Sequence, residues 1–369
     1  MHWNTLLLAP CSLLTIYPQM CIQLIFTKEG VPMTLSVPLP AGSYDIIISP
    51  EILNRISEYA NLDRRVLVVT DDGVPREYAD TVAAQCKAAT VVTLPQGEQS
   101  KTLANFEKLL TVMLDNGFTR TDCAVAVGGG VVTDITGFAA ASYMRGIDFY
   151  NVPTTLLAQT DASVGGKTAV DLNGVKNIVG AFHQPKGVFI GTDTLKTLDS
   201  RQYNAGMAEI IKIALCFDAD FFDGIKNGTL STEELISRSV QIKADVVTAD
   251  EKEAGLRRVL NFGHTVGHAV ETLSGLLHGE SVAIGMTYMC SPEVRKELCT
   301  VLEKYSLPTR TDISPERLFS VLIHDKKADG DKINIVVVNK IGSFEIKCVS
   351  FEEMGKKLRN NAECRMHNA

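Results

Sequence analysis

From Met33 onward, short apolar runs alternate with longer segments of helical spacing, and this alternation restricts the folds that the chain can adopt. Segments such as 65–73 and 123–130 are typical of strands, because each has a short apolar run that ends in turn residues or glycines. Segments 101–117 and 131–146 repeat apolar residues with helical spacing. Further strands are expected at 44–49 and 89–97, and further helices from about residues 50 and 75. Strands separated by helices predict a mostly parallel sheet covered on both faces.

The character of the sequence changes near residue 194. Beyond it, apolar residues recur three and four positions apart through 206–216, 234–251 and 264–277, which predicts helices. We therefore expect an N-terminal Rossmann-like α/β domain at 33–193, followed by a mainly helical domain at 194–369. Ligands of such proteins usually bind at the carboxyl ends of the strands or between the domains.

Residues 1–32 precede this pattern as an apolar leader. They carry no Lys or Arg before the hydrophobic run, unlike a secretory signal. Pro10 and Pro18 interrupt any helix that would cross a membrane. Because Met33 opens the first expected strand, we expect the leader to be a mis-assigned upstream start.

Charge and cysteine content narrow the class of protein. The 36 basic and 43 acidic residues give a net charge of -7, which offers no basic footprint for nucleic acid or for an anionic membrane. An anionic ligand would therefore need a local basic pocket. Nine cysteines form no CxxC pair, and their odd number argues against a disulfide framework. These features favour a cytoplasmic protein with reduced thiols.

Three consecutive glycines lie between an expected strand and an expected helix. Gly128, Gly129 and Gly130 would let a phosphate approach backbone N–H groups at the positive end of the helix, which predicts a dinucleotide site. The spacing departs from GxGxxG, since Thr133 stands where the third glycine would be, and a tight turn is the alternative. Asp71 could bind a ribose hydroxyl, or it could cap a turn.

A second glycine-rich segment, GGKT at 165–168, ends like a phosphate-binding loop. Asp161 stands where the first glycine of that motif should be, so the sequence does not favour a nucleotide triphosphatase. Lys167, Lys176 and Asn177 still form a group suited to a phosphate or pyrophosphate. Solvated loop lysines are the alternative.

Three histidines lie within fifteen residues of one another. His264 and His268 are four apart and share a helical face, as in metal sites of the HExxH type, and His278 follows. The pair could supply two ligands, or one ligand and one acid or base, or only a polar stripe. Glu209 sits among apolar residues and could be a third ligand. Its alternative role is an ion pair with Lys212, three residues later.

The order of these motifs resembles that of the 3-dehydroquinate synthases, from Met33 to about Lys347. The motifs that carry the resemblance are GEQSKT, GGGVVTDITGFAAASYMRG, VPTTLLAQTDASVGGKTAVD, GVKN, AGMAEIIK, RRVLNFGHTVGHAVE, HGE and HDKK. The resemblance implies an enzyme of the shikimate pathway of aromatic amino acid biosynthesis. It also implies NAD, a divalent metal such as Zn or Co, and a homodimer. The leader before Met33 departs from the family pattern.

The resemblance also assigns roles to single residues. It implies metal ligands at Glu209, His264 and His278, and proton transfer by His268. The implied substrate contacts are Asp161, Lys167, Asn177, Lys212, Lys243, Arg257, Asn261 and either Lys326 or Lys327, with Arg145 reaching across the dimer. The implied NAD contacts are Glu98, Lys101, Gly129, Gly130, Val131, Asp134, Thr154, Thr155, Lys176, Thr194, Leu195, Lys196 and Thr197, and the strand-end and glycine-loop motifs add Asp71 and Lys167.

The implied reaction converts 3-deoxy-D-arabino-heptulosonate 7-phosphate to 3-dehydroquinate and phosphate. Transient oxidation at C5 by NAD acidifies the neighbouring C–H, so that phosphate can leave; hydride then returns and an aldol step closes the ring. Another sugar phosphate cyclase, of the valiolone or deoxy-inosose type, is the runner-up, and Lys243, Arg257 and Asn261 argue against it because only the heptulosonate carries a carboxylate. Less favoured are a metal-dependent polyol dehydrogenase and an inactive dinucleotide-binding scaffold.

Overall fold

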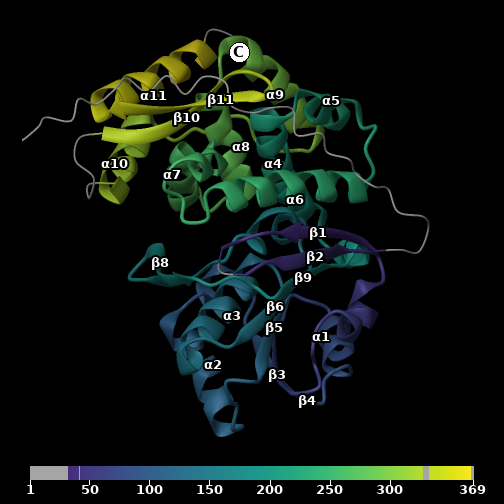
Figure 1. Cartoon of the computed structure of the whole chain (residues 1–369). Helices are drawn as coiled ribbons and strands as arrows, with labels where there is room; N and C mark the ends of the chain where they lie inside the picture. Colours follow the sequence, from purple (N-terminus) through teal and green to yellow (C-terminus); the bar gives the residue numbers. More distant parts are fainter. Residues whose placement is uncertain (1–31, 41, 327–331, 367–369) are drawn as a thin grey trace, which may run out of the picture.

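The computed structural model describes residues 32–40, 42–326 and 332–366. The predicted leader falls outside the described residues, apart from Pro32. Figure 1 shows a region built around a sheet in its lower half and a mostly helical region above it. None of the helices within the described ranges is long and apolar enough to cross a membrane.

The central sheet has seven strands in the order β1-β2-β9-β6-β5-β3-β4. The strands expected from Met33 and at 44–49 are β1 and β2, which pair antiparallel, and every other pairing in this sheet is parallel. The strands are β1 (Met33–Val37), β2 (Tyr44–Ile48), β3 (Arg65–Asp71), β4 (Ala88–Leu94), β5 (Cys123–Gly128), β6 (Asp148–Pro153) and β9 (Gly187–Ile190). The prediction of a mostly parallel sheet is confirmed.

Both faces of this sheet are covered, which explains the continuous apolar runs 66–69 in β3 and 123–127 in β5. In β3, Val66 and Val68 pack on the side of α1 (Arg76–Ala83), while Leu67 and Val69 face α2 (Leu103–Asp115) and α3 (Gly130–Ser142). The alternation follows from the two-residue period of a strand. Where a helix was expected from about residue 50, the chain forms a short 3-10 helix, Ile52–Glu58.

The helical region holds eight α-helices among the described residues. They are α4 (Ser200–Phe217), α5 (Ala219–Asn227), α6 (Thr232–Ala249), α7 (His264–Ser274), α8 (His278–Tyr288), α9 (Pro292–Lys304), α10 (Pro315–Lys326) and α11 (Phe351–Met366). Polar residues begin several of them: Asp199 caps α4, and Ser231 forms a capping box with Glu234 at α6. A hairpin of β10 (Lys332–Lys340) and β11 (Ser343–Ser350), absent from the prediction, lies beside α11.

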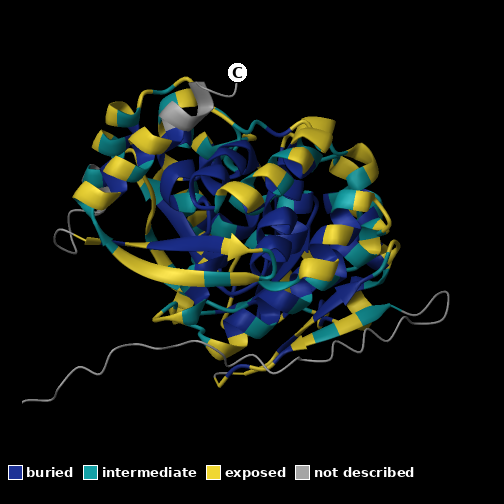
Figure 2. Ribbon diagram, turned by 90° about the horizontal axis from the view of Figure 1, so that it is seen from above, coloured by how far each residue is buried: buried dark blue, intermediate teal, exposed yellow. Residues whose placement is uncertain are grey.

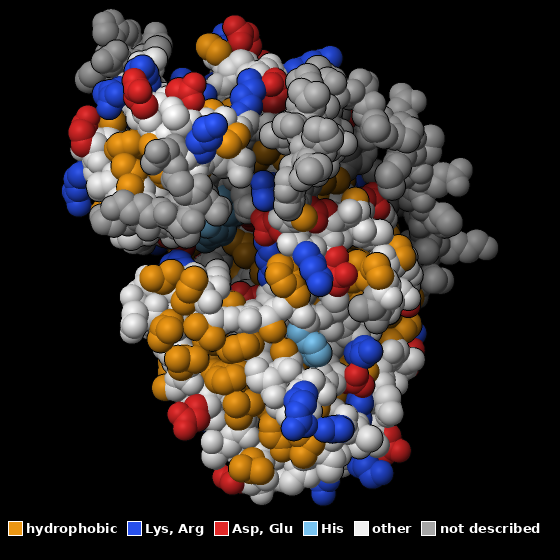
Figure 3. Space-filling view, turned by 60° about the vertical axis from the view of Figure 1, so that its left-hand side comes forward, with side chains coloured by type: hydrophobic (Ala, Val, Ile, Leu, Met, Phe, Trp, Pro, Cys, Tyr) orange, Lys and Arg blue, Asp and Glu red, His pale blue; other side chains and the backbone are white. Residues whose placement is uncertain are grey.

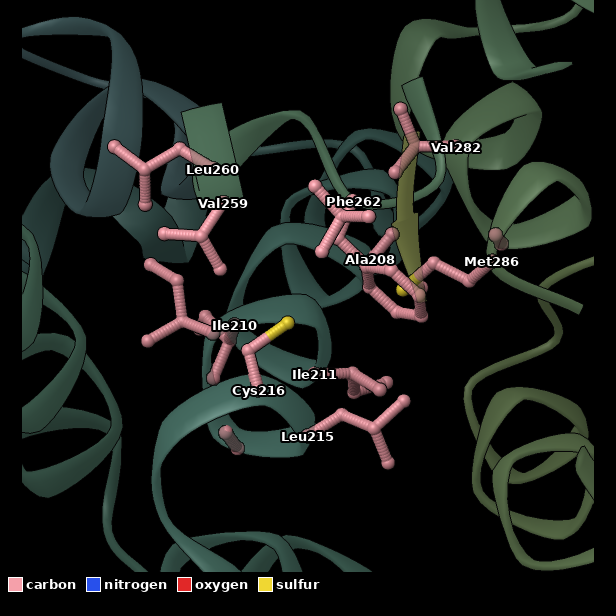
Figure 4. Close-up of a cluster of buried hydrophobic side chains, with 14 of the residues drawn as sticks. Ala208, Ile210, Ile211, Leu215, Cys216, Val259, Leu260, Phe262, Val282 and Met286 are labelled. Atoms are coloured by element: carbon pink, nitrogen blue, oxygen red, sulfur yellow. The ribbon is translucent and has the colours of Figure 1, made fainter. Parts of the chain in front are cut away.

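The core of this region is built largely on α4. Figure 4 shows Ile210, Ile211 and Leu215 of α4 beside Phe262 and Met286, all of them buried. Burying each such side chain stabilises the fold by roughly 1.5–3 kcal/mol. Seen from above in Figure 2, the interior helices are buried and the outer faces of the peripheral helices are exposed.

The two regions share apolar contacts and are also bridged by a separate hairpin. Residues of β1, β2 and β9 belong to the same buried cluster as α4, so the edge of the sheet is part of the helical core. The hairpin, β7 (Lys167–Leu172) with β8 (Val175–Phe182), packs against α3. The domain limit expected between 193 and 194 falls in the connection from β9 to α4, and it stays a prediction.

Candidate active site

The carboxyl ends of the parallel strands bring the glycine motif and Thr154 to one edge of the sheet. The Thr154 N–H donates to the Gly128 carbonyl at 3.0 Å, and α3 begins directly beyond, at Gly130. A Cβ on Gly129 would lie 3.2 Å from the Thr155 methyl group, and one on Gly130 would lie 3.2 Å from the Ala162 methyl. The glycines therefore allow the segment after β6 to pack closely against the N-terminal end of α3, and the backbone N–H groups at this helix end suit a pyrophosphate.

Other residues expected to bind the cofactor gather near this helix end. Lys101 is buried and donates to Asp134 Oδ2 at 2.5 Å and to Asn177 Oδ1. Lys176, next to Asn177 on β8, lies 3.9 Å from Glu98. Val131 follows Gly130 within α3. The structure thus assembles residues from three separate motifs.

The remaining cofactor candidates have structural partners of their own. The Asp71 carboxylate accepts from the Gly73 N–H at 2.9 Å, which is the turn-capping role. Thr194 donates to the Gly191 carbonyl at 2.8 Å within a 3-10 helix, Thr192–Thr197. Leu195 and Lys196 belong to the same short helix, and Thr197 pairs with the Tyr78 hydroxyl at 2.9 Å. Their role toward a cofactor stays a prediction.

Glu209, His264 and His278 meet around one point, from three different helices. Their potential ligand atoms lie within 4.8 Å of one another. Glu209 Oε1 is 3.8 Å from His264 Nε2 and 3.5 Å from His278 Nε2, and it has no hydrogen-bond partner among the described residues. A buried carboxylate oxygen left without a partner, facing two imidazole nitrogens, fits a divalent cation.

Close contacts at glycines allow these helices to approach one another. A Cβ on Gly279, the residue after His278, would lie 1.9 Å from the Ala205 carbonyl oxygen of α4. A Cβ on Gly285 of α8 would lie 1.9 Å from the Gly263 carbonyl oxygen, just before α7. Real Cβ atoms do not come so close, so larger residues would separate α8 from both neighbours. The glycines are therefore part of what brings the three ligand candidates together.

Protonation in this cluster differs from residue to residue. Burial and the charge of Lys212 hold the pKa of His264 well below its usual range, so its imidazole is neutral. Burial alone would lower the pKa of His278, but the carboxylates of Glu209 and Glu271 outweigh it and raise that pKa to about 10. Burial also opposes the charge of Glu209, yet Lys212 and the two histidines hold the pKa of its carboxyl well below the usual range. Glu209 and His264 are thus in forms that bind metals, and a cation bound at this site would displace the second proton of His278.

His268 lies one turn after His264 on α7 and is exposed. Its ring centroid is 5.3 Å from that of His264 and 5.9 Å from that of His278. The structure therefore groups all three histidines while placing His268 toward solvent, where proton exchange is possible.

Lysines and an arginine line the space between the two regions. Lys243 of α6 donates to the Asp161 carbonyl at 2.6 Å and to its carboxylate, within a π-helical turn that follows β6. Lys212 pairs with Glu209 one turn along α4. Burial lowers the pKa of Lys243 to about 8, against the attraction of Asp161. Arg257 is buried and donates to the Gly165 carbonyl at 2.9 Å.

Lys167 and Asn261 meet at the carboxylate of Glu253. The Lys167 ammonium contacts Glu253 Oε2, and the Asn261 amide donates to Oε1 at 2.5 Å. Glu253 has a φ of 59°, in the left-handed region. Figure 3 shows a hollow between the upper and lower halves, with histidine side chains on its wall. Lys167 of the β7–β8 hairpin and Asn261 of the helical region are thus brought together by one carboxylate.

Two expected substrate contacts are not placed in this cleft by the structure. Arg145 follows the far end of α3, which is roughly 20 Å from Gly130 along the helix axis. Lys326 ends α10, but its side chain lies outside the described residues, as does the whole of Lys327.

Comparison with known proteins identifies the family. The family model described as 3-dehydroquinate synthase N-terminal matches residues 91–205, and that described as 3-dehydroquinate synthase C-terminal matches residues 206–328. The chain belongs to the 3-dehydroquinate synthase family. A 3-dehydroquinate synthase from Enterococcus faecalis (strain ATCC 47077 / OG1RF) is 42% identical, over 87% of this chain and 97% of the relative.

Solved structures outside the 3-dehydroquinate synthases share the fold. A 2-deoxy-scyllo-inosose synthase complexed with carbaglucose-6-phosphate, NAD+ and Co2+ superposes with a TM-score of 0.80 at 26% identity, covering 89% of this chain and 100% of the other. A 2-epi-5-epi-valiolone synthase from Streptomyces hygroscopicus subsp. jinggangensis 5008, with NAD+ and Zn2+ bound, gives 0.79 at 28% identity, covering 88% and 98%. The family resemblance expected from the motifs is confirmed.

Two carboxylates of the cleft were not identified from the sequence. Glu271 lies on α7 three residues after His268, and its carboxylate is 3.3 Å from His278 Nδ1. Its helical spacing from both earlier histidines was a signal that could have found it. Glu253 sits in an irregular loop before the 3-10 helix Leu256–Asn261, and no local pattern marks it.

The first prediction tests the close approach of α8 to α4. Gly279→Ala should lower the free energy of unfolding by about 1–3 kcal/mol, because its Cβ overlaps the Ala205 carbonyl oxygen. The gain in helix propensity, up to about 1 kcal/mol, is too small to offset this. Urea denaturation measures the difference.

The matched control is Gly355→Ala in α11, whose Cβ would meet its nearest neighbour, Phe319, at 3.5 Å. This variant should be as stable as the wild type or slightly more so. Equal stability of Gly279→Ala and the wild type would show that the helices do not depend on this glycine.

Proposed function

We propose that this protein is an NAD- and divalent-metal-dependent 3-dehydroquinate synthase of the shikimate pathway. It would convert 3-deoxy-D-arabino-heptulosonate 7-phosphate to 3-dehydroquinate and phosphate. The observation that carries the proposal is the buried Glu209 carboxylate, which meets His264 and His278 beside a cleft lined by cations, in a chain of this family. The names of its relatives at about 40% identity support the same activity.

Glu209, His264 and His278 would hold the metal, Zn or Co. Three protein ligands leave a coordination position open, as catalytic metal sites require. When bound, the metal would polarise a substrate oxygen as a Lewis acid. Lys212 sits beside Glu209 and balances its charge, so the ligand set remains ionised within the protein.

The N-terminal end of α3 would hold the dinucleotide. Gly129 and Gly130 form this helix end, where backbone N–H groups suit a pyrophosphate, and Lys101 and Lys176 add positive charge nearby. When bound, NAD would accept a hydride and return it, so the reaction has no net redox change. The two related cyclases whose structures contain NAD+ and a divalent metal support this pairing of cofactors.

Cationic side chains would orient the substrate. The heptulosonate carries a carboxylate and a phosphate, and Lys167, Lys243 and Arg257 come from different segments around the cleft. The Arg257 Nε atom is buried without a hydrogen-bond partner among the described residues, and a polar ligand would supply one. Asn261 would add a hydrogen bond to the same ligand. These side chains suit a substrate that carries a carboxylate. This favours the heptulosonate, because the substrates of the related cyclases have no carboxylate.

His268 would move protons. It lies within the histidine group but is exposed, whereas His264 is mostly buried. A histidine side chain can both accept and donate a proton, and general acid–base groups contribute about 10²- to 10⁴-fold to a rate. We therefore propose that His264 binds the metal and that His268 transfers protons.

A homodimer is also proposed, on the strength of an exposed apolar patch. The β7–β8 hairpin exposes Leu172, Val175, Ile178 and Phe182, and Figure 3 shows hydrophobic side chains gathered below the cleft. Contiguous patches of this kind mark association surfaces. A dimer would also allow Arg145, remote from the cleft of its own chain, to reach that of its partner.

The decisive test of the activity uses purified protein with the heptulosonate phosphate, catalytic NAD and Zn²⁺ or Co²⁺. Phosphate and 3-dehydroquinate should form in equal amounts, without accumulation of NADH. Net NADH formation would instead indicate a polyol dehydrogenase. Absence of phosphate release, with the metal and NAD shown to be bound, would falsify the proposed function.

A second test separates the histidines. His264→Ala and His278→Ala should lose most of the bound metal, because each would remove one of three ligands. His268→Ala should keep the metal and lower kcat by about 10²- to 10⁴-fold. Metal content by mass spectrometry and steady-state kinetics measure the two effects. Loss of metal from His268→Ala would point instead to ligation by His264 and His268 together.

A third test concerns the dimer. The Ile178→Asp variant should sediment as a monomer at micromolar concentration, because a charge would enter the buried interface. Val91→Asp is the matched control, since Val91 is an exposed apolar residue on β4 and not on the hairpin. Sedimentation velocity reads the result. A dimeric Ile178→Asp protein, or a monomeric wild type, would contradict the proposal.

A further inference from the structure

His278 lies between two carboxylates that face different nitrogens of its ring. Nε2 is 3.5 Å from Glu209 Oε1, and Nδ1 is 3.3 Å from Glu271 Oε2. Glu271 is on α7, and its side chain is 13% exposed, so water competes little for this contact. The ring therefore lies between a carboxylate of α4 and a carboxylate of α7, and only the α7 carboxylate forms a hydrogen bond with it.

The second oxygen of Glu271 is held by a residue from the other region of the protein. The Lys176 ammonium donates to Glu271 Oε1 at 2.7 Å from the β7–β8 hairpin. The next residue of the hairpin, Asn177, accepts from the buried Lys101. Adjacent residues of β8 thus connect the helical region, through Glu271, with the cofactor end of the sheet region, through Lys101.

We propose that Glu271 is a positioning residue for the cation site, and that Lys176 holds Glu271 in place. Glu271 accepts the Nδ1–H of His278, which fixes the tautomer and the ring orientation that leave Nε2 directed at the cation. Lys176 restrains the Glu271 carboxylate through its other oxygen. The hairpin that lines the cofactor end thereby sets cation affinity. This inference rests on the proposed function, in which Glu209, His264 and His278 bind a divalent metal.

A carboxylate behind a ligating histidine is a recurrent way to tune a metal site. Removing such a partner typically weakens metal binding by about 10- to 100-fold. The tautomer has a second effect. A neutral histidine that carries its proton on Nδ1 has a free lone pair on Nε2, which can bind the metal. Both effects depend on the hydrogen bond from Nδ1 and not on direct contact between Glu271 and the metal.

A competing arrangement would make Glu271 a ligand itself. His268, Glu271 and His278 also have potential ligand atoms within 4.8 Å of one another. Both oxygens of Glu271 already have partners, however, whereas Glu209 Oε1 has none among the described residues. In addition, use of Nδ1 by a second cation would remove the contact that orients His278. The geometry therefore favours Glu271 behind the ligand set.

The test measures Co²⁺ and Zn²⁺ affinity of the metal-free protein by competition with a chromophoric chelator. Glu271→Ala should weaken binding by about 10- to 100-fold. Glu271→Gln retains an oxygen that accepts from Nδ1–H, so it should restore most of the affinity and leave the Co²⁺ absorption spectrum unchanged. Lys176→Met should weaken binding less than Glu271→Ala, and the double variant should bind no more weakly than Glu271→Ala alone.

The matched control is the ion pair of Lys226 and Glu297, which joins α5 to α9. Lys226→Met and Glu297→Gln remove the same kinds of charge and should leave metal affinity unchanged. Circular dichroism and thermal unfolding of each variant show whether the protein is folded, so that a loss of affinity is assigned to the site.

Three results would overturn the inference. Unchanged affinity in Glu271→Ala would show that the carboxylate does not position His278. Loss of metal or an altered Co²⁺ spectrum in Glu271→Gln, or two ions per chain in the wild type, would make Glu271 a ligand. Absence of any metal binding by the wild type would overturn the proposed metal site first, and the two failures are thereby distinguished.

Discussion

Glu209 carries a carboxylate in the middle of α4 with no exposure to solvent, and much of the helical region is arranged to compensate it. Leaving such a charge unpaired costs about 3–5 kcal/mol. Lys212 supplies one positive charge from the same helix, which satisfies one oxygen. The other oxygen needs a partner from elsewhere, and α7 and α8 bring imidazoles toward it. The close packing of these helices at Gly279 and Gly285 therefore also places the two imidazoles near the buried carboxylate.

The sequence revealed the fold more fully than the site. Strands β3 and β5 were predictable because burial on both faces favours continuous apolar runs, 66–69 and 123–127, and the segments that follow them show helical spacing. The β10–β11 hairpin was missed because only part of it is buried and the helical pattern around it dominates. Short irregular helices such as Ile52–Glu58 do not have enough turns to produce a clear period.

Within the site, residues close together in the sequence could be grouped from the sequence, whereas residues far apart could not. His264 and His268 could be paired from spacing alone, because a helix places residues four apart on one face. Glu209 and His278 join them only through tertiary packing, so spacing left their roles open and the family resemblance supplied them. Glu271 could have been found from the same helical spacing. Glu253 could not, since its position depends on a loop with a left-handed φ.

The ion pairs of the site differ in burial. The buried pairs fix the structure, whereas a ligand can replace a partner in the exposed ones. The Lys212 and Glu209 side chains are 2% and 0% exposed, so loss of either partner would leave the other charge buried and unpaired. The Lys167 side chain is 48% exposed, and a pair such as the one it forms with Glu253 contributes only about 0–1 kcal/mol. A phosphate or carboxylate can therefore replace Glu253 as the partner of Lys167 at little cost. An acidic chain can bind anions in this way, because weak pairs hold its exposed lysines near the cleft while its buried pairs fix the geometry.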